Sequence, residues 1–121
     1  MSVQWPEKVI FCEVGPRDGL QNEPSTLAVE RKIALIEGVA DAGVKIVEVG
    51  SFVHPKAVPQ MADTDEVART FRRVEGVEYR ALVANLKGVE RAMASGITKV
   101  KLTVSASESH AKANLNKTPR E

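Results

Sequence analysis

The sequence predicts an α/β fold in which parallel strands alternate with helices. Short, mostly apolar runs rich in β-branched residues are typical of buried strands. The segments between these runs carry apolar residues at helical spacing, and glycines close most of them. Strands without polar–apolar alternation are expected where helices cover a parallel sheet, so these observations together favour an α/β class.

Four strands are expected along the chain. They cover residues 9–14, 45–49, 79–84 and 100–104. Gly15 and Pro16 close the first strand, and Gly50 closes the second. Each interval between strands is long enough for one helix, which predicts a series of βα units.

Three helices are expected between these strands. The first has an apolar stripe formed by Val29, Ile33, Ile36 and Ala40, and Gly43 suits its C-terminal end. The second is expected near Asp63, because Asp63 and Glu66 have the spacing of a capping box. Its apolar stripe is expected to be Val67, Phe71 and Val74. The third covers residues 86–95, with Asn85 as its N-cap.

A weak internal repeat suggests a larger architecture. Glu13 and Glu48 each precede the end of an expected strand, 35 residues apart, and both are expected to face inward. Four such units make half of a (β/α)8 barrel of about 250 residues. Thr118, Pro119 and Glu121 have the spacing of a further helix start. Residues 1–121 are therefore expected to be a truncated, N-terminal part of a single TIM-barrel domain, the alternative being a frayed polar tail.

Composition excludes several classes of protein. Lys and Arg number 17 against 16 Asp and Glu, and this balance gives no footprint for nucleic acid or an anionic membrane surface. The single cysteine, Cys12, excludes an intrachain disulfide and is expected to be a small buried core residue. There is no apolar run of membrane-spanning length and no signal-peptide pattern, so a cytoplasmic location is expected.

The densest group of chemically active residues is Glu13–Pro24, directly after the first expected strand. In parallel α/β folds, ligands bind at this end of the strands. Asp18 offers hard oxygen ligands for Mg²⁺ or Mn²⁺. Arg17 offers a permanent cation for a developing oxyanion. An adjacent Arg–Asp pair alone is more often a surface ion pair, so the pair needs its context to indicate function.

The run Glu13–Glu23 strongly resembles the N-terminal signature of the hydroxymethylglutaryl-CoA lyase family, in the DRE-TIM metallolyase superfamily. Further similarity covers nearly the whole chain. It lies in residues 51–63, 85–88, 105–109 and 112–116. The first motif is highly specific, whereas the others would be weak alone.

The resemblance implies a divalent-metal-dependent lyase that cleaves 3-hydroxy-3-methylglutaryl-CoA to acetyl-CoA and acetoacetate in leucine degradation. By position, Asp18 corresponds to a metal ligand, and Arg17 to an arginine that polarises the thioester carbonyl and stabilises the enolate. Glu48 corresponds to a catalytic-site glutamate, and Gln21 to a residue of the substrate pocket. The implied partner is an acyl-CoA, with a homo-oligomer in the full-length enzyme.

Parts of the family pattern lie outside this sequence. The family takes further metal ligands from a later His-x-His pair and an Asn, and a late cysteine serves as an acid. His54 and His110 do not form that pair, and a surface or loop-structuring role is expected for each. The 121-residue chain alone is therefore expected to be inactive. It is also expected to associate with itself, because the first and fourth strands of a half-barrel would be unpaired, apolar sheet edges.

Three alternatives stay open at this point. Condensing relatives of the superfamily, such as isopropylmalate, homocitrate or citramalate synthases, share the Arg-Asp-Gly-x-Gln motif. Asn22 and Glu23 after that motif, with Glu13 before it, favour the lyase. The chain could also be a non-catalytic half-barrel that only binds or assembles. Lastly, Arg17 could pair with a buried glutamate in a purely structural ion network.

Overall fold

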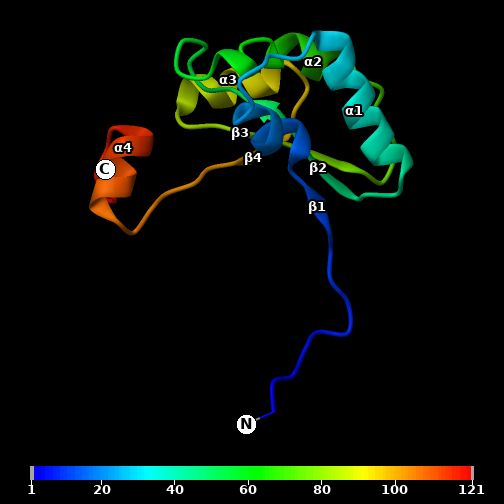
Figure 1. Ribbon diagram of the computed structural model, residues 1–121, viewed down its shortest axis with the longest axis horizontal. Coiled ribbons are helices and arrows are strands. Elements are labelled where there is room, and N and C mark those ends of the chain that lie inside the picture. The colour runs from blue at the N-terminus through cyan, green and yellow to red at the C-terminus, as the bar shows by residue number, and fades with distance from the viewer. Residues whose placement is uncertain (1, 121) are drawn as a thin grey trace.

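The computed structural model describes residues 2–120 and contains one parallel sheet with helices on one side (Figure 1). The strands are β1 (Cys12–Glu13), β2 (Ile46–Ser51), β3 (Glu78–Leu82) and β4 (Lys99–Lys101). The α-helices are α1 (Val29–Asp41), α2 (Thr64–Thr70), α3 (Leu86–Ala94) and α4 (Glu108–Leu115). The strands lie side by side in sequence order, and every pair is parallel. The predicted fold class, parallel βα units as in the first half of a TIM barrel, is confirmed.

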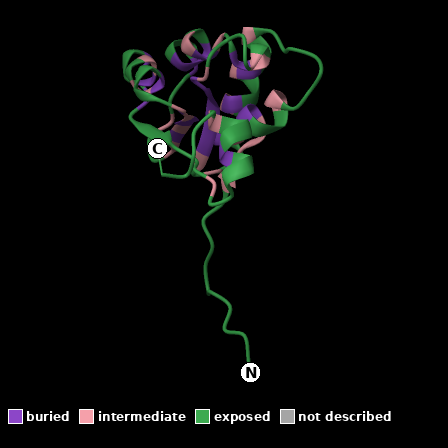
Figure 2. Cartoon of the chain, turned by 90° about the vertical axis from the view of Figure 1, so that its left-hand side faces the viewer, coloured by how far each residue is buried: buried purple, intermediate pink, exposed green. Residues whose placement is uncertain are grey.

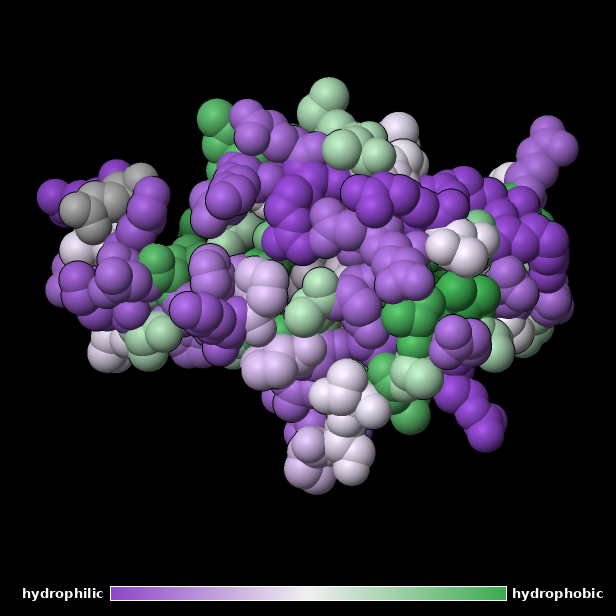
Figure 3. All heavy atoms as spheres, turned by 90° about the horizontal axis from the view of Figure 1, so that it is seen from above, coloured by the Kyte–Doolittle hydropathy of each residue, from purple (hydrophilic) through white to green (hydrophobic). Residues whose placement is uncertain are grey.

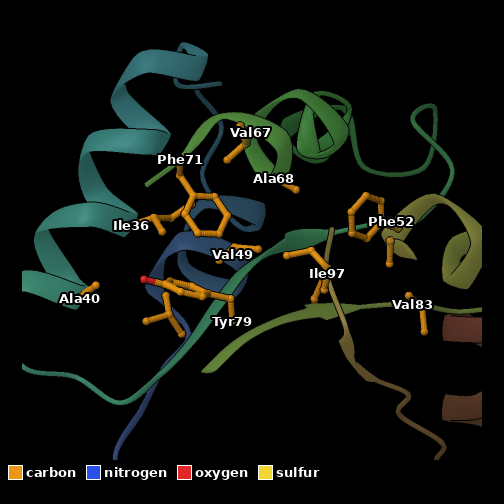
Figure 4. Packing of buried hydrophobic residues seen from close by; sticks show 13 residues of the cluster. Ile36, Ala40, Val49, Phe52, Val67, Ala68, Phe71, Tyr79, Val83 and Ile97 are labelled. Carbon is orange, nitrogen blue, oxygen red and sulfur yellow. The ribbon is translucent and has the colours of Figure 1, made fainter. Parts of the chain in front are cut away.

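The hydrophobic core lies between the sheet and helices α1 to α3 (Figure 4). Ile36 and Ala40 of α1 are buried as the apolar stripe predicts, with Ile36 fully inaccessible. They meet Val47 and Tyr79 of the sheet in one cluster, together with Phe71 after α2. Seen from above the helices, the surface is mainly hydrophilic (Figure 3). The helices therefore present one apolar face to the sheet and one polar face to solvent.

The opposite face of the sheet has no helix over it in the described chain (Figure 1). The segment before β1 runs away from the sheet and is exposed along its length (Figure 2). Val9, Ile10 and Phe11 were expected to extend the first strand, but only Cys12–Glu13 pairs with β2, and these three residues are 76%, 72% and 64% exposed. Their composition suits a strand, but in residues 2–120 no strand pairs with them to extend the ladder.

The register of β1 corrects the predicted repeat. Cys12 pairs with Ile46 and Glu13 with Val47, whereas the repeat predicts that Glu13 and Glu48 lie on the same face of the sheet. Paired residues of neighbouring strands share a face, so Glu13 lies on the face of the core residue Val47, opposite to Glu48. The prediction that both glutamates face inward is wrong for Glu13.

Two predicted helix ends also differ from the structure. Asp63 precedes α2 but its side chain caps no helical N–H, because its carboxylate binds the ammonium of Lys32 instead, at 2.5 Å. Phe71 has an extended backbone, so α2 ends at Thr70 and Val74 lies outside it. By contrast, Asn85 caps α3 as predicted, its side-chain oxygen accepting a hydrogen bond from the N–H of Gly88 at 2.9 Å.

The segment after β4 holds a helix that sequence patterns did not predict. Ser107 caps α4 by accepting the N–H of His110 at 3.3 Å, and the helix ends at Leu115, followed by Asn116 in the left-handed conformation with φ +54°. The predicted helix start at Thr118 is not helical over Thr118–Arg120, and Glu121 lies outside the described residues. Within the described chain, no helix is long and apolar enough to cross a membrane.

Candidate active site

The loop after β1 is a single π-helical turn, Gly15–Gly19, built on one carbonyl oxygen. The oxygen of Val14 accepts the N–H groups of Arg17 at 3.0 Å and Asp18 at 2.7 Å. The carboxylate of Glu13 accepts the N–H of Gly15 at 2.7 Å. A Cβ at Gly15 would stand 2.9 Å from that carboxylate, so a larger residue here would require the Glu13 side chain to move. This turn holds the Arg17–Asp18 pair at the carboxyl end of the strand.

Arg17 is the centre of a buried ion cluster. Its Nε donates to Glu48 Oε1 at 2.9 Å, and its Nη1 donates to Asp18 Oδ1 at 3.0 Å. The Nζ of Lys101, on β4, donates to the second oxygen of Glu48 at 3.3 Å. The side chain of Glu48 is only 3% exposed, so both of its oxygens are held by cations away from bulk water. The structure thus brings Arg17, Asp18 and Glu48 together, as predicted.

Asp18 is the open member of this cluster. Its side chain is 53% exposed, while that of Arg17 is 11% exposed. A carboxylate held in place by one guanidinium contact and open to solvent suits a hard cation such as Mg²⁺ or Mn²⁺. Among the residues that the structure describes, however, no group of three His, Cys, Asp or Glu side chains could hold a metal ion. The residues here therefore fit one ligand of a metal site, not a whole site.

Gln21 lines a cavity of about 490 Å³ at the same edge of the sheet. The walls come from the segment after β2, the end of β3 and the C-terminal part of α4. They include Val53, His54, Ala57, Val58, Leu82, Asn85, Thr103 and Asn114. The side-chain oxygen of Gln21 is buried and has no hydrogen-bond partner among the described residues. A buried acceptor without a partner beside a cavity is suited to a ligand that donates a hydrogen bond. Arg17, Asp18 and Glu48 are not among the cavity's lining residues.

A second group of charged residues lies on the open face of the sheet, on β3 and β4. Glu78 accepts hydrogen bonds from Arg80 and Lys99, which lowers the pKa of its carboxyl group. The same contact with Glu78 raises the pKa of Arg80. Burial, and then the negative charge of Glu48, raise the pKa of the Cys12 thiol. Cys12 is half-buried and lies outside the core cluster, so the prediction of a core cysteine is wrong.

The two histidines take the structural roles expected of them. His54 is exposed, and its Nδ1 accepts the N–H of Lys56 at 3.2 Å, which shapes the loop after β2. The Nε2 of His110 lies 3.3 Å from the amide nitrogen of Asn114, one turn along α4. Neither histidine contacts the Arg17 cluster in a described hydrogen bond or ion pair.

One buried charge was missed from the sequence. Lys32 of α1 is 4% exposed and donates both to the carbonyl oxygen of Gln60 and to Asp63, each at 2.5 Å. A lysine within a polar helical segment gives no signal of its own. Its spacing does, because Lys32, Ile36 and Ala40 follow one another at four-residue steps and so share the core side of α1.

Comparison with known proteins supplies independent information. A lyase from Pseudomonas aeruginosa, named 3-hydroxy-3-isohexenylglutaryl-CoA/hydroxy-methylglutaryl-CoA lyase, is 50% identical over 111 residues, 92% of this chain and 37% of that protein. The crystal structure of the HMG-CoA lyase of Bacillus subtilis matches 96% of this chain and 39% of its own, at 46% identity and a TM-score of 0.92. A lyase from Acenitobacter baumannii, solved with coenzyme A and 3-methylmalate, matches 90% of this chain and 36% of its own, at 40% identity and a TM-score of 0.88.

The chain thus spans less than two-fifths of the length of the relatives described above. A family model described as HMGL-like matches residues 8–121, which includes the Arg17 cluster, the cavity and all four strands. The chain belongs to the HMGL-like family.

Proposed function

We propose that this chain is part of a divalent-metal-dependent lyase that cleaves 3-hydroxy-3-methylglutaryl-CoA to acetyl-CoA and acetoacetate, a reaction of leucine degradation. The observation that carries this proposal is the ion cluster of Arg17, Asp18 and Glu48 at the carboxyl edge of a parallel sheet. That edge is where enzymes of this architecture place their chemistry. The names of the similar lyases and the coenzyme A in one of their structures support the acyl-CoA substrate.

Arg17 is the residue proposed to act on the thioester. When the C2–C3 bond breaks, negative charge develops on the thioester oxygen of the departing enolate. A guanidinium that is 11% exposed stabilises such a charge far better than one in water, because few water molecules screen it. Glu48, expected as a catalytic-site glutamate, is proposed to orient Arg17 by accepting a hydrogen bond from its Nε at 2.9 Å. Its charge also offsets the cost of burying the guanidinium.

Asp18 is proposed to supply one carboxylate ligand of the divalent cation, Mg²⁺ or Mn²⁺. The cation would act as a Lewis acid on the substrate's oxygens when bound. Gln21 is proposed to bind the substrate, since it lines the cavity and its buried side-chain oxygen has no hydrogen-bond partner among the described residues. The remaining ligands would come from parts of the complete protein outside this chain.

The four βα units are proposed to be the N-terminal part of one TIM-barrel domain. The open, charged face of the sheet supports this, as do the exposed apolar residues at both edges, such as Phe11 (64%) and Val104 (70%). We also propose that the complete enzyme is a homo-oligomer and that it is located in the cytoplasm. The 121-residue chain expressed alone should self-associate in size-exclusion chromatography with light scattering. A stable monomer would contradict the half-barrel proposal.

A condensing activity is the second candidate, because such relatives share the Arg-Asp-Gly-x-Gln motif found at residues 17–21. Within this chain, Asn22 Nδ2 donates to the carbonyl oxygen of Asp18 at 2.8 Å. The side chain that sequence comparison associates with the lyase thus helps to fold the metal-binding turn. The contact itself is structural, and the lyase is favoured instead by the names of the similar proteins, which are lyases.

The test uses the complete protein that contains this chain. Purified protein with Mn²⁺ is mixed with 3-hydroxy-3-methylglutaryl-CoA, and both acetyl-CoA and acetoacetate are measured. The proposal predicts equal amounts of the two products. The condensing alternative predicts no cleavage but release of free coenzyme A from acetyl-CoA and a 2-oxo acid. A binding module would give neither reaction.

A further inference from the structure

The segment between β2 and α2, residues 52–63, forms one wall of the cavity that contains Gln21. Val53, His54, Ala57 and Val58 come from this segment. Gln21 comes from the loop after β1, which also carries Arg17 and Asp18. The shape of the cavity therefore depends on how residues 52–63 sit relative to the loop after β1.

Lys32 fixes the C-terminal end of that segment. Its ammonium is almost completely buried and has two oxygen partners there, the carbonyl oxygen of Gln60 and the carboxylate of Asp63, both at 2.5 Å. A buried ammonium needs such partners, because an unpaired charge in the interior is very costly. These two hydrogen bonds hold the C-terminal end of residues 52–63 against α1.

Gln60 connects Lys32 to the loop after β1, which carries Arg17, Asp18 and Gln21. While its backbone oxygen accepts from Lys32, its side-chain amide donates to the carbonyl oxygen of Glu23 at 2.9 Å. Glu23 lies two residues after Gln21, and its own N–H donates to the carbonyl oxygen of Leu20 at 3.3 Å. A continuous chain of hydrogen bonds thus runs from Lys32 through Gln60 to the loop that holds Arg17, Asp18 and Gln21.

We propose that Lys32 is a positioning residue for the reaction: through Gln60 it sets the distance between the Arg17–Gln21 loop and the cavity wall formed by residues 52–63. This inference rests on the proposed lyase function. Lys32 touches no reacting atom, so its effect is on turnover through geometry. A displacement of about 1 Å at a catalytic group can lower turnover roughly 10²-fold.

The matched control is Arg72, which makes the other side-chain link between α1 and the α2 region. Its guanidinium donates to Asp41 Oδ1 and Oδ2, each at 3.0 Å, and its backbone N–H donates to Glu37 at 2.8 Å. Asp41 is the last residue of α1 and Lys32 lies in its first turns, so the two links hold opposite ends of the same helix. Replacing the Arg72 side chain removes this exposed ion pair with α1 without touching either loop of the site.

The experiment compares Lys32→Met and Arg72→Met with the wild type in the complete protein. We expect Lys32→Met to lower kcat roughly 10–100-fold with KM little changed, as for a misplaced catalytic group. Hydrogen–deuterium exchange should become faster in residues 20–24 and 54–62 and stay unchanged in α3. Arg72→Met should leave kcat and both exchange patterns at the site unchanged. Unchanged kcat in Lys32→Met, or an equal loss in Arg72→Met, would overturn the proposal.

The double variant Lys32→Met/Asp63→Asn separates positioning from stability. It removes the buried charge together with its partner, so the melting temperature should recover relative to Lys32→Met. The link to Gln60 stays broken, so kcat should stay low. Recovery of kcat along with stability would mean that Lys32 is only structural.

Gln60→Ala covers the case in which Lys32→Met does not fold. This variant keeps the carbonyl that accepts from Lys32 and removes only the amide that donates to Glu23. It should speed exchange in residues 20–24 and lower kcat several-fold, and no change in either would overturn the proposal. If the wild type itself does not cleave the substrate, the proposed function fails, while the exchange measurements still decide whether Lys32 couples the two loops.

Discussion

The two faces of the sheet differ in the residues that they carry, one apolar and the other charged. On the helix-covered face, Val47 and Ala81 are fully inaccessible and belong to the apolar core. On the open face, the adjacent residues in the same strands are Glu48, directly after Val47, and Arg80, directly before Ala81, and both belong to ion pairs. Adjacent residues of one strand therefore have different roles: one packs in the core, and the other is a charged residue on the face that carries the site. Substitutions on the two faces should accordingly change different measured quantities.

The largest change in stability is expected on the covered face. Ile36→Ala removes a fully buried side chain and should lower the free energy of unfolding by about 2–5 kcal/mol. Leu35→Ala is the matched control, since Leu35 is 37% exposed on the same helix and should cost much less. Urea denaturation of the complete protein measures both. Turnover per folded molecule should be unchanged in both variants, and a loss in Ile36→Ala would show that the covered face also shapes the site.

A large change in turnover is expected on the open face. Glu48→Gln keeps the size of the side chain and removes the charge that orients Arg17, so kcat should fall about 10²-fold, equivalent to about 2.7 kcal/mol. Glu90→Gln on the exposed side of α3 serves as the control and should be silent. Steady-state kinetics with the complete protein measure kcat for both variants. Wild-type turnover in Glu48→Gln would reduce the cluster to a structural ion network.

The smallest effect is expected at Glu78, lower on the open face. Hydrogen bonds from Arg80 and Lys99 lower the pKa of Glu78 in the folded protein. The resulting stabilisation is present above the ordinary glutamate pKa of about 4.3 and is lost as the pH falls through the lower folded value. Glu78→Gln should therefore cost about 0.2–1 kcal/mol at pH 7 and nothing in strong acid. Thermal melts at several pH values test this, with the exposed Glu75→Gln as control.

The covered face was predictable from the sequence and the open face only in part. Apolar spacing identified Ile36 and Ala40 because burial follows directly from helical periodicity. The meeting of Arg17 and Glu48 was predicted by placing both at the carboxyl ends of strands. The face of Glu13 was predicted wrongly, because a repeat in the sequence does not fix strand register to a single residue.

The remaining differences depend on contacts between segments distant in sequence, which a local pattern does not reveal. Asp63 has the pattern of a capping residue, but a buried lysine 31 residues earlier takes its carboxylate. Val9–Phe11 has the composition of a strand, but pairing needs a neighbour as well as composition. Lys32 was missed for the same reason, since its partners lie in another loop.

The measurement that tests the account most directly is turnover as a function of Mn²⁺ concentration in the complete protein, for wild type, Asp18→Asn and Arg17→Gln. Asp18 is proposed to bind the cation, and Arg17, at 3.0 Å from it, to stabilise the departing enolate. The account predicts that Asp18→Asn raises the Mn²⁺ concentration needed for half-maximal turnover. Arg17→Gln should leave that concentration unchanged and lower maximal turnover about 10²–10³-fold. If Arg17→Gln instead shifts the Mn²⁺ dependence and keeps full turnover at saturating metal, the two roles are assigned wrongly.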